Sequence, residues 1–441
     1  MASAERDGNL TRLMELVSPR VGLIRSVGRV QRGADEPVPP VICQATLSHF
    51  DHRMATRRDR ESAGKGRTEQ EAMAGAIGEA LERYCATYID ARATRRATWP
   101  AVCNNAVAPP ECVLYSERQY ARRGFPYPRW RPDDDITWTT AWELPEKRQI
   151  LLPASLVYMA PATPRPEDAL VQGTSNGLAA GPDFDRACLA ALCELAERDA
   201  FLITWMARLP APAVDFTALP GPAATIRAHY SRHGVHLRVF RLCTDLPIHA
   251  MMTIALDTVG TGPAALVALG CHLNPVAALE KSLFEMCQVL PGEKRLFREK
   301  PPAQRLRGYA DVKSLEDHSA YLTISERMNE FAFLLDNGRT VALADLPDHS
   351  QGATRDDLDF CVAGLRQAGC RVLCADLTTP DLATYPVRVV RAVATGLQPI
   401  HFGHGEERLG GRRLFELPHK LGFAPAPLGE SDLNPCPHPL A

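Results

Sequence analysis

Three segments of the chain repeat one pattern, in which a helix start is followed by an alanine and then by two polar side chains three residues apart. The segments are TEQEAMAGAIGEALER at 68–83, DFDRACLAALCELAER at 183–198 and NPVAALEKSLFEMCQ at 274–288. Residues three apart lie on the same side of a helix, so each segment places two polar side chains on one helix face. The pairs are Glu79 with Glu82, Glu194 with Glu197, and Glu285 with Gln288.

Each segment opens with its own helix-start signal. Thr68 with Glu71 three residues later forms a capping box. Asp183 is a favoured N-cap residue, and Pro182 before it stops the preceding segment. Asn274 stands before a proline that suits the first helical position. These signals predict three helices, and their convergence on one site is a further inference.

The residues around the acids indicate burial. A Glu-x-x-Glu pair followed by Arg is usually a solvated helix face, but Leu, Ile, Ala and Cys surround the first two pairs on nearly every side. Burying a carboxylate costs several kcal/mol unless it is paired or bound to metal. Arg83 and Arg198 can neutralise part of the charge, and Mg2+ with a nucleotide phosphate could neutralise the rest. We therefore expect the three helices to form an acidic pocket that needs a cation.

Glycine-rich segments precede the first two helices. Gly64-Lys65-Gly66 resembles a phosphate-binding turn, although a P-loop would require Ser or Thr directly after the lysine. Its place before a helix N-terminus favours an anion. The segment GTSNGLAAG at 173–181 allows close backbone approach to a ligand, and Ser175 and Asn176 add hydrogen-bond donors. Ordinary glycine-rich connections are the alternative in both places.

Longer blocks around these helices resemble one family. Residues 64–85 and 174–201 look like the two signature blocks of the YcaO superfamily, LFEMCQ at 283–288 resembles its third block, and VLCADLTTPDL at 372–382 with LQPIHFG at 397–403 resembles its C-terminal core. The resemblance covers roughly residues 45–405. Within the superfamily, the chain is most similar to the cyclodehydratase D proteins that form azolines in thiazole/oxazole-modified microcins.

The resemblance implies a mixed α/β fold of the YcaO type, in which three acidic helices surround a site for ATP and Mg2+. The implied metal ligands are Glu79, Glu82, Glu194, Glu197 and Glu285. The expected nucleotide-binding residues are these acids together with Lys65, Arg83, Ser175, Asn176, Arg198 and Gln288. Two positions depart from the family pattern. Gly75 replaces a serine, and Gly292 replaces an arginine for which Lys294 or Arg295 could substitute.

The ending LNPCPHPLA spaces three prolines in a Pro-x-Pro-x-Pro pattern. By composition alone this is a disordered, extended tail. The resemblance implies instead a tail that threads into the active site, with Pro437, Pro439 and Ala441 as the catalytic tail residues and the terminal carboxylate helping proton transfer. Leu440 and Ala441 extend beyond the family's proline pattern, so the place of that carboxylate stays open.

Charge and cysteine content limit the class of protein. The 441 residues carry a net charge of −2 with a pI near 6.7, which gives no basis for binding nucleic acid or an anionic membrane. We see neither a signal peptide nor an apolar run of membrane-spanning length. The 13 cysteines include no Cys-x-x-Cys pair and predict reduced thiols in a cytoplasm. Cys370 and Cys374 are expected in a strand or core, and His49 with His52 is a weak metal candidate.

The remaining pattern predicts a mixed α/β chain. Expected strands are 235–243, 249–256, 264–270, 370–377 and 387–393, and a helix over 356–369 ends at Gly369. A YcaO domain is expected over 46–405, between a weakly patterned N-terminal segment, 1–45, and a C-terminal region, 406–441. Within the domain, residues 96–165 are rich in proline, tryptophan and arginine and are expected to form loops around a peripheral lobe.

These expectations combine into the ATP-using subunit of an azoline-forming cyclodehydratase. A Cys, Ser or Thr side chain of a ribosomal precursor peptide attacks the preceding backbone carbonyl, the resulting oxyanion takes the γ-phosphate of ATP, and loss of phosphate leaves a thiazoline or oxazoline. The resemblance implies an E1-like partner that binds the leader peptide and an FMN dehydrogenase that acts afterwards, and it leaves a homodimer open. The alternatives are a YcaO enzyme that forms a thioamide or amidine, and a non-catalytic docking scaffold of the same fold.

Overall fold

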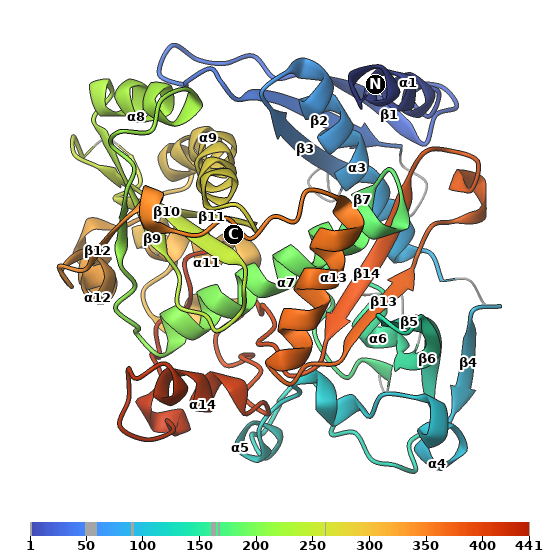
Figure 1. Cartoon of the computed structure of the whole chain (residues 1–441). Helices are drawn as coiled ribbons and strands as arrows, with labels where there is room; N and C mark the ends of the chain where they lie inside the picture. Colours follow the sequence, from blue (N-terminus) through green and yellow to red (C-terminus); the bar gives the residue numbers. More distant parts are fainter. Residues whose placement is uncertain are drawn as a thin grey trace. The chain divides into compact units, whose positions relative to one another are not determined.

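The chain divides into two compact units, each built from separate stretches of sequence (Figure 1). The computed structural model describes residues 2–48, 60–89, 92–159, 165, 168–260 and 262–440. Unit 1 comprises Met1–Gln31, Val41–Leu195 and Gln351–Gly396, and unit 2 comprises Arg32–Pro40, Ala196–Ser350 and Leu397–Ala441. Three residues singled out from the sequence lie outside the described residues: His49, His52 and Ala441.

The first sheet of unit 1 has three antiparallel strands in the order β1-β2-β3. Helix α3 packs along β2 and β3, as Figure 1 shows. Strand residues point alternately to the two faces of a sheet, and every second residue of β3 is buried. The bounds are α1 Ala2–Met14, β1 Ile24–Arg29, β2 Val41–Leu47, β3 Glu61–Gly66 and α3 Glu69–Thr87.

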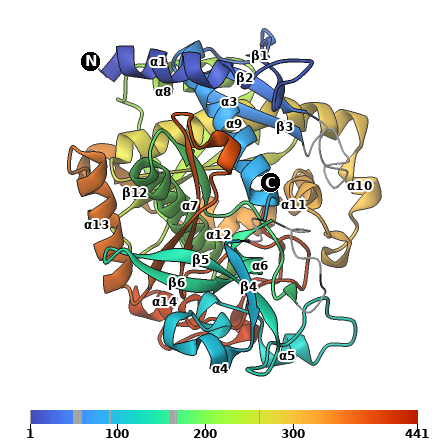
Figure 2. The same cartoon turned by 90° about the vertical axis from the view of Figure 1, so that its right-hand side faces the viewer.

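The second sheet of unit 1 has six antiparallel strands in the order β4-β5-β13-β14-β7, with β6 paired to β5. Figure 2 shows β4, β5 and β6 side by side. The strand bounds are β4 Thr94–Ala97, β5 Ile136–Leu144, β6 Arg148–Pro153, β7 Leu178–Gly181, β13 Val372–Asp376 and β14 Arg388–Ala394. The helices are α4 Trp99–Val102, α5 Glu117–Tyr120, α6 Ala154–Val157 and α13 Thr354–Gln367.

Two regions are more regular than the sequence predicts. The expectation of loops over 96–165 is wrong for β5 and β6, because β5 is a nine-residue strand that pairs with both β4 and β13. Its Trp138 is fully buried, with Nε1 donating to the carbonyl of Ala97 at 2.9 Å. The N-terminal segment 1–45 likewise holds α1, β1 and the start of β2.

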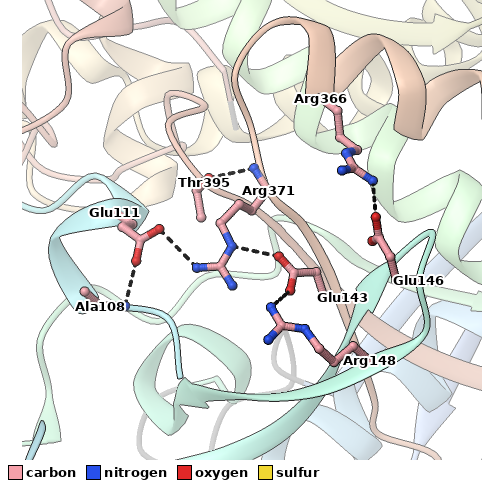
Figure 3. A network of polar contacts seen from close by, with 8 residues as sticks. All are labelled: Ala108, Glu111, Glu143, Glu146, Arg148, Arg366, Arg371 and Thr395. Carbon is pink, nitrogen blue, oxygen red and sulfur yellow. Dashed lines mark hydrogen bonds and ion pairs between the residues drawn. The ribbon is translucent and has the colours of Figure 1, made fainter. Parts of the chain in front are cut away.

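Charged side chains fasten the β5–β6 hairpin to the start of β13 (Figure 3). Arg371 Nε donates to Glu143 on β5 at 2.7 Å, and its Nη1 donates to Glu111 at 3.2 Å. Arg366, at the end of α13, pairs with Glu146 in the hairpin turn at 2.5 Å. A single exposed ion pair contributes little to stability. Because Arg371 bridges two acids, the set is a network that links β5 to the start of β13 and to the segment of Glu111.

Unit 2 is built on a five-stranded sheet in the order β11-β10-β9-β8-β12, in which only β8 and β12 pair in parallel. Helix α9 lies against β11 and β10. The strands are β8 Ala213–Asp215, β9 Val235–Arg241, β10 His249–Asp257, β11 Ala265–His272 and β12 Thr340–Ala342. The helices are α8 Pro222–Arg232, α9 Pro275–Glu299, α10 Pro302–Arg305, α11 Leu315–Tyr321, α12 Ala332–Leu335 and α14 Arg413–Lys420.

The regular elements predicted from periodicity are present. β9, β10, β11, β13 and β14 fall where strands are predicted, and Gly369 follows α13 with a φ of 88°, the left-handed conformation that suits a helix end. Helix α7, Phe184–Met206, contributes its residues up to Leu195 to unit 1 and those from Ala196 to unit 2. Within the described part of the chain, no helix has the length and apolar character needed to cross a membrane.

Candidate active site

The three acidic segments begin as their N-cap residues predict. Thr68 Oγ1 accepts a hydrogen bond from Glu71 N at 3.2 Å, Asp183 Oδ1 accepts one from Arg186 N at 2.8 Å, and Asn274 Oδ1 accepts one from Ala277 N at 2.9 Å. The capping box at Thr68 is modified, because Glu71 accepts from the backbone N–H of Arg67. The segments are the first parts of α3, α7 and α9, so the predicted helices are confirmed.

The glycines before α3 serve close packing of the helix on β3. A Cβ atom on Gly64 would lie 2.0 Å from the carbonyl oxygen of Ala72 and 2.2 Å from the nitrogen of Ala76. The predicted phosphate-binding turn is therefore wrong in its conformation, because Gly64-Lys65-Gly66 forms a strand paired with β2. Lys65 points to the face of the sheet opposite Gly64 and Gly66, since neighbouring strand residues alternate.

Two acids of α3 bond to backbone N–H groups of neighbouring strands. Glu79 accepts from Ala63 N on β3 at 3.0 Å and from Arg83 Nη2 at 2.8 Å. Glu82 Oε1 accepts from Ala180 N on β7 at 2.7 Å. The carboxylates are thus held between two strands of unit 1, which is a more ordered position than a solvated helix face provides.

Glu82 lies among like charges. Its pKa is raised to about 8, by burial first and then by the negative charge of Glu79; the Ala180 hydrogen bond lowers it, Glu194 raises it again, and Arg83 lowers it. Acids from α3 and from the first half of α7 therefore repel one another within unit 1. A cation beside them would relieve this repulsion.

The other two predicted acids, Glu197 and Glu285, belong to unit 2. Glu197 is 8% exposed and accepts from Arg198 Nη1 at 2.6 Å. The next residue, Asp199, is fully buried, and both of its oxygens lie 3.0 Å from Arg413 Nε. Sequence reasoning missed Asp199, although it lies only two residues after Glu197, and no sequence signal marks Arg413 as its partner.

Two of the predicted nucleotide-binding side chains have a buried amide oxygen with no hydrogen-bond partner among the described residues. These atoms are Oδ1 of Asn176 in unit 1 and Oε1 of Gln288 on α9 in unit 2. The loop that carries Asn176 is fixed by the buried Arg391, whose Nη1 and Nη2 donate to the carbonyls of Asn176 at 2.5 Å and Thr174 at 2.6 Å. A buried polar atom of this kind is costly without a partner, so both amides fit a bound polar ligand.

The acids fit a metal that arrives with nucleotide better than a preformed metal cage. Across the described ranges, no three His, Cys, Asp or Glu side chains are arranged so that they could hold a metal ion by themselves. Mg2+ usually keeps several waters and binds through one or two carboxylates plus substrate phosphates. The acid pairs Glu79 with Glu82 on α3 and Glu194 with Glu197 on α7, and the single acid Glu285 on α9, are compatible with that requirement.

The predicted set divides between the units. Unit 1 holds Lys65, Glu79, Glu82, Arg83, Ser175, Asn176 and Glu194, and unit 2 holds Glu197, Arg198, Glu285, Gln288, Pro437 and Pro439. Within unit 1 the structure brings Glu79, Glu82 and Glu194 into one electrostatic group. Ser175 is exposed in the turn before β7. The convergence of all three helices on one pocket stays a prediction.

A cavity of about 600 Å3 lies in unit 1 beside the start of α3. Its lining includes Gly75, where the family has serine, and Ala180, whose N–H bonds to Glu82. Gly75 packs close to Gly64, because a Cβ atom on Gly75 would lie 3.3 Å from the Cα of Gly64. Glycine at position 75, in place of the serine of the family pattern, therefore lies where α3 and β3 are in close contact.

The C-terminal segment is ordered, so the reading from composition is wrong. Pro437, His438, Pro439 and Leu440 are all buried in unit 2. Trp205 Nε1 donates to the carbonyl of Cys436 at 2.9 Å, which attaches the segment to the end of α7. A proline-rich segment has few hydrogen bonds of its own, so neighbouring side chains must supply them. The catalytic role of Pro437 and Pro439 stays a prediction.

Comparison with known proteins agrees with this arrangement. A model of the family described as YcaO cyclodehydratase, ATP- and Mg2+-binding, matches residues 63–398. A heterocyclase solved with substrate and cofactor is 27% identical, with a TM-score of 0.84, and the match covers 99% of this chain and 57% of that one. The heterocyclase TruD is 26% identical, with a TM-score of 0.69, and the match covers 83% of this chain and 50% of that one.

A third solved structure shares the fold at lower identity. It is YcaO from Methanopyrus kandleri bound with AMPPCP and Mg2+, which is 19% identical with a TM-score of 0.65, and the match covers 89% of this chain and 91% of that one. This chain spans about half the length of the two heterocyclases that it matches. The family model matches most of the chain and includes the acids of α3, α7 and α9, and the chain therefore belongs to the YcaO cyclodehydratase family of ATP- and Mg2+-binding proteins.

Proposed function

We propose that this chain is the ATP-using subunit of a peptide cyclodehydratase that forms azoline rings. The observation that carries the proposal is the repulsive acid group of unit 1, in which burial and then Glu79 raise the pKa of Glu82 to about 8. Such a group is unfavourable by itself and becomes favourable when a divalent cation binds with nucleotide phosphates.

The residues of the chain bind and orient the reactants. When bound, ATP with Mg2+ supplies the phosphoryl group that turns a peptide amide oxygen into a leaving group. The arginines next to the acids compensate phosphate charge, and the buried amides offer polar contacts. The proposed metal ligands are Glu79, Glu82, Glu194, Glu197 and Glu285, and the further nucleotide contacts are Lys65, Arg83, Ser175, Asn176, Arg198 and Gln288.

The proposed substrate is a Cys, Ser or Thr residue of a ribosomally made peptide. Its thiol or hydroxyl adds to the preceding backbone carbonyl, the former carbonyl oxygen leaves as phosphate, and the amide nitrogen loses its proton as the ring C=N bond forms. A proton acceptor must be held in place for this last step, since small misplacements cost large factors in rate. The buried tail that contains Pro437 and Pro439 supports this product class over a thioamide or amidine.

We also propose partners and a compartment. The two heterocyclases above 25% identity are chains of about twice the matched length. An E1-like protein would hold the leader of the precursor peptide, and an FMN dehydrogenase would oxidise the finished ring. A homodimer is compatible with this scheme. None of the 13 cysteines, all of which lie in the described part of the chain, forms a disulfide, which favours a reducing cytoplasm.

A binding experiment tests the acid group without any peptide. Isothermal titration calorimetry with AMPPCP and Mg2+ should show binding to the wild-type protein that EDTA abolishes, and Glu82→Gln should weaken it. Glu117→Gln is the matched control, because Glu117 lies in unit 1, is 79% exposed and pairs only with Arg129 among the ion pairs of the described residues. Equal binding by all three proteins would contradict the role of the acid group.

A turnover experiment tests the product. The protein is incubated with ATP, Mg2+, an E1-like partner and a Cys-, Ser- and Thr-rich peptide encoded beside it, and mass spectrometry should show the loss of one water for each ADP formed. Exchange of amide oxygen for sulfur would indicate a thioamide, and condensation with an amine would indicate an amidine. ATP-independent binding of the peptide without turnover would favour the docking scaffold.

A further inference from the structure

Two histidines in unit 2 hold the C-terminal segment through a closed set of hydrogen bonds. His318 of α11 donates from Nδ1 to the carbonyl of His438 at 2.8 Å, and its Nε2 accepts from Gly403 N at 2.9 Å. His438 donates from Nε2 to the carbonyl of His401 at 2.7 Å, and its Nδ1 accepts from Leu440 N at 3.3 Å. Each imidazole thus faces one backbone acceptor and one backbone donor.

This arrangement fixes both rings as neutral tautomers. A neutral imidazole has one N–H donor and one acceptor nitrogen, whereas a protonated ring has two donors. Protonation of His318 at Nε2 would place an N–H against the N–H of Gly403. The two rings are also stacked, with centroids 4.0 Å apart, so two positive charges there would repel.

The other end of the segment is fastened to the last turn of α7. Asn434 N donates to the carbonyl of Met206 at 2.6 Å, and Trp205 Nε1 donates to the carbonyl of Cys436 at 2.9 Å. The side-chain oxygen of Asn434 also accepts from Cys436 N at 3.1 Å. The first of these bonds gives a partner to the carbonyl of Met206, which lies at the C-terminal end of α7, where carbonyls have no partner within the helix.

From these points the segment runs back along α7. Cys436 meets Trp205, and two residues later the ring of His438 meets Phe201 at 5.7 Å between centroids. Two residues of an extended proline-rich chain span about 6 Å, which equals the rise of about four helical residues. The next turn of α7 in this direction carries Glu197 and Arg198, and Arg198 already acts electrostatically on His438.

We propose that His318 is a positioning residue, which clamps His438 so that the C-terminal segment is aimed along α7 at the turn that carries Glu197 and Arg198. The clamp itself stands on the contacts of unit 2, and its importance for ring formation rests on the proposed function. No local sequence signal identifies His318, which lies 120 residues before its partner.

Thiol labelling tests the clamp without any activity measurement. Cys436 lies inside the clamped segment and is 3% exposed, whereas Cys103 is exposed. In native His318→Ala, iodoacetamide labelling of Cys436 relative to Cys103 should rise about tenfold, because a lost buried hydrogen bond raises the population of the open segment. Peptide mass spectrometry measures the ratio. The fully buried Cys287 on α9 of unit 2 must stay unlabelled, which excludes unfolding of the unit that carries the clamp.

Two further variants make the result specific. His249→Ala is the matched control, because His249 is as buried as His318, at 1% exposure, and also bonds a backbone carbonyl, that of Pro347, at 2.7 Å. It should leave Cys436 protected. His318→Asn keeps a donor for the His438 carbonyl and should restore part of the protection. If Cys436 stays protected in His318→Ala, or is exposed equally in His249→Ala, the clamp is overturned.

The catalytic consequence has its own readout. His318→Ala should lower kcat for ring formation about tenfold or more while the KM for ATP and the affinity for AMPPCP with Mg2+ stay unchanged. Normal ring formation by a variant with an exposed Cys436 would overturn the positioning role. A wild-type protein that protects Cys436 but forms no ring would instead overturn the proposed function, while the labelling ratio still decides the clamp.

Discussion

A hydrogen bond of 2.7 Å joins the backbone N–H of Ala180 on β7 to Oε1 of Glu82 on α3. The same carboxyl group has a pKa raised to about 8, by burial first and then by Glu79. The hydrogen bond from Ala180 thus favours the charged form of the Glu82 carboxyl group, whereas burial and the charge of Glu79 disfavour it. The balance between the two depends on whether a cation is present.

We expect AMPPCP and Mg2+ to release a proton from Glu82 when they bind between pH 4.5, its ordinary pKa, and about pH 8. A raised carboxyl pKa means that the folded state binds this proton more tightly than the unfolded state. The free energy of unfolding of the ligand-free protein therefore falls as pH rises through the same window. Calorimetry in buffers of different protonation enthalpy measures the released proton, and Glu82→Gln should abolish the release.

Glu197→Gln should lower ATP turnover by roughly two orders of magnitude, the loss typical when one charge-stabilising group is removed from an active site. Gln can still accept the hydrogen bond that Arg198 donates at 2.6 Å, so the fold should be kept. Phosphate release and circular dichroism measure the two effects. Turnover near the wild-type rate in a folded variant would contradict the metal role of Glu197.

Gly64→Ala should lower the free energy of unfolding of unit 1 by about 1–3 kcal/mol, the usual cost of overpacking. The added Cβ atom would lie 2.0 Å from the Ala72 carbonyl. Gly28→Ala on β1 is the control, since no atom lies within 4 Å of its added Cβ. Denaturant unfolding compares the two. A stable Gly64→Ala variant that loses only nucleotide binding would restore the phosphate-turn interpretation.

Arg413→Ala should destabilise unit 2 by about 3–5 kcal/mol, because it leaves the fully buried Asp199 without its ion partner. Asp199→Asn together with Arg413→Ala should recover part of the loss, since the backbone N–H of Gln398 can still bond to the amide oxygen. Chemical denaturation of the single and double variants gives the coupling between the two positions. Additive losses would show that the pair does not act as a unit.

Acid should loosen the C-terminal segment. Burial lowers the pKa of His318 to about 4, against the bond to His438 and the charge of Asp317, which raise it. The unfolded state then binds the proton more tightly, so the clamp contributes fully above pH 6.5 and is lost as pH falls toward 4. The other charged or titratable groups that act on the cluster are His401, His404, Arg408 and Arg198, and when positively charged they all oppose protonation.

Hydrogen exchange of residues 434–440, corrected for the intrinsic effect of pH, measures this loosening. His318→Asn removes the titrating ring and should remove the pH step. Exchange that stays slow at pH 4 in the wild-type protein would show that the neutral rings are not required.

The starts of α3, α7 and α9 could be predicted because the residues that determine them are close together in the sequence. Thr68, Asp183 and Asn274 were identifiable as N-caps because the side chain and the N–H group that it accepts from lie three residues apart in the chain. The sequence suggested that Gly64 and Gly66 form a phosphate-binding turn. In the structure glycine is needed there because α3 packs against β3 and leaves no room for a side chain. The high content of proline, tryptophan and arginine in residues 96–165 suggested loops, so β5 was not predicted. The alternation of apolar and polar residues in ITWTTAWEL is nevertheless a strand signal.

The site was predictable where the family pattern is written in the sequence and unpredictable where partners are distant. Glu79, Glu82 and Glu194 were identified from spacing, and the structure places them in one electrostatic group. The Asp199–Arg413 pair spans 214 residues and the His318–His438 clamp spans 120, so no window of sequence contains either. Composition also suggested disorder for a tail that side chains elsewhere in the chain hold in place.

The division of the chain sets an order in which the units can be completed during synthesis. Unit 1 uses no residue after Gly396, whereas the core of unit 2 includes Leu440 and receives the backbone of Cys436 at Trp205. Domains generally fold as units while the chain emerges, N-terminal parts first. Unit 1 can therefore fold before the C-terminal segment of unit 2 has been made. A chain that stops before residue 436 leaves Trp205 Nε1 without its bond to the carbonyl of Cys436. The bond between Trp205 and Cys436 can therefore form only after residue 436 has been made, so the contact of the C-terminal segment with α7 is a late step in the completion of unit 2.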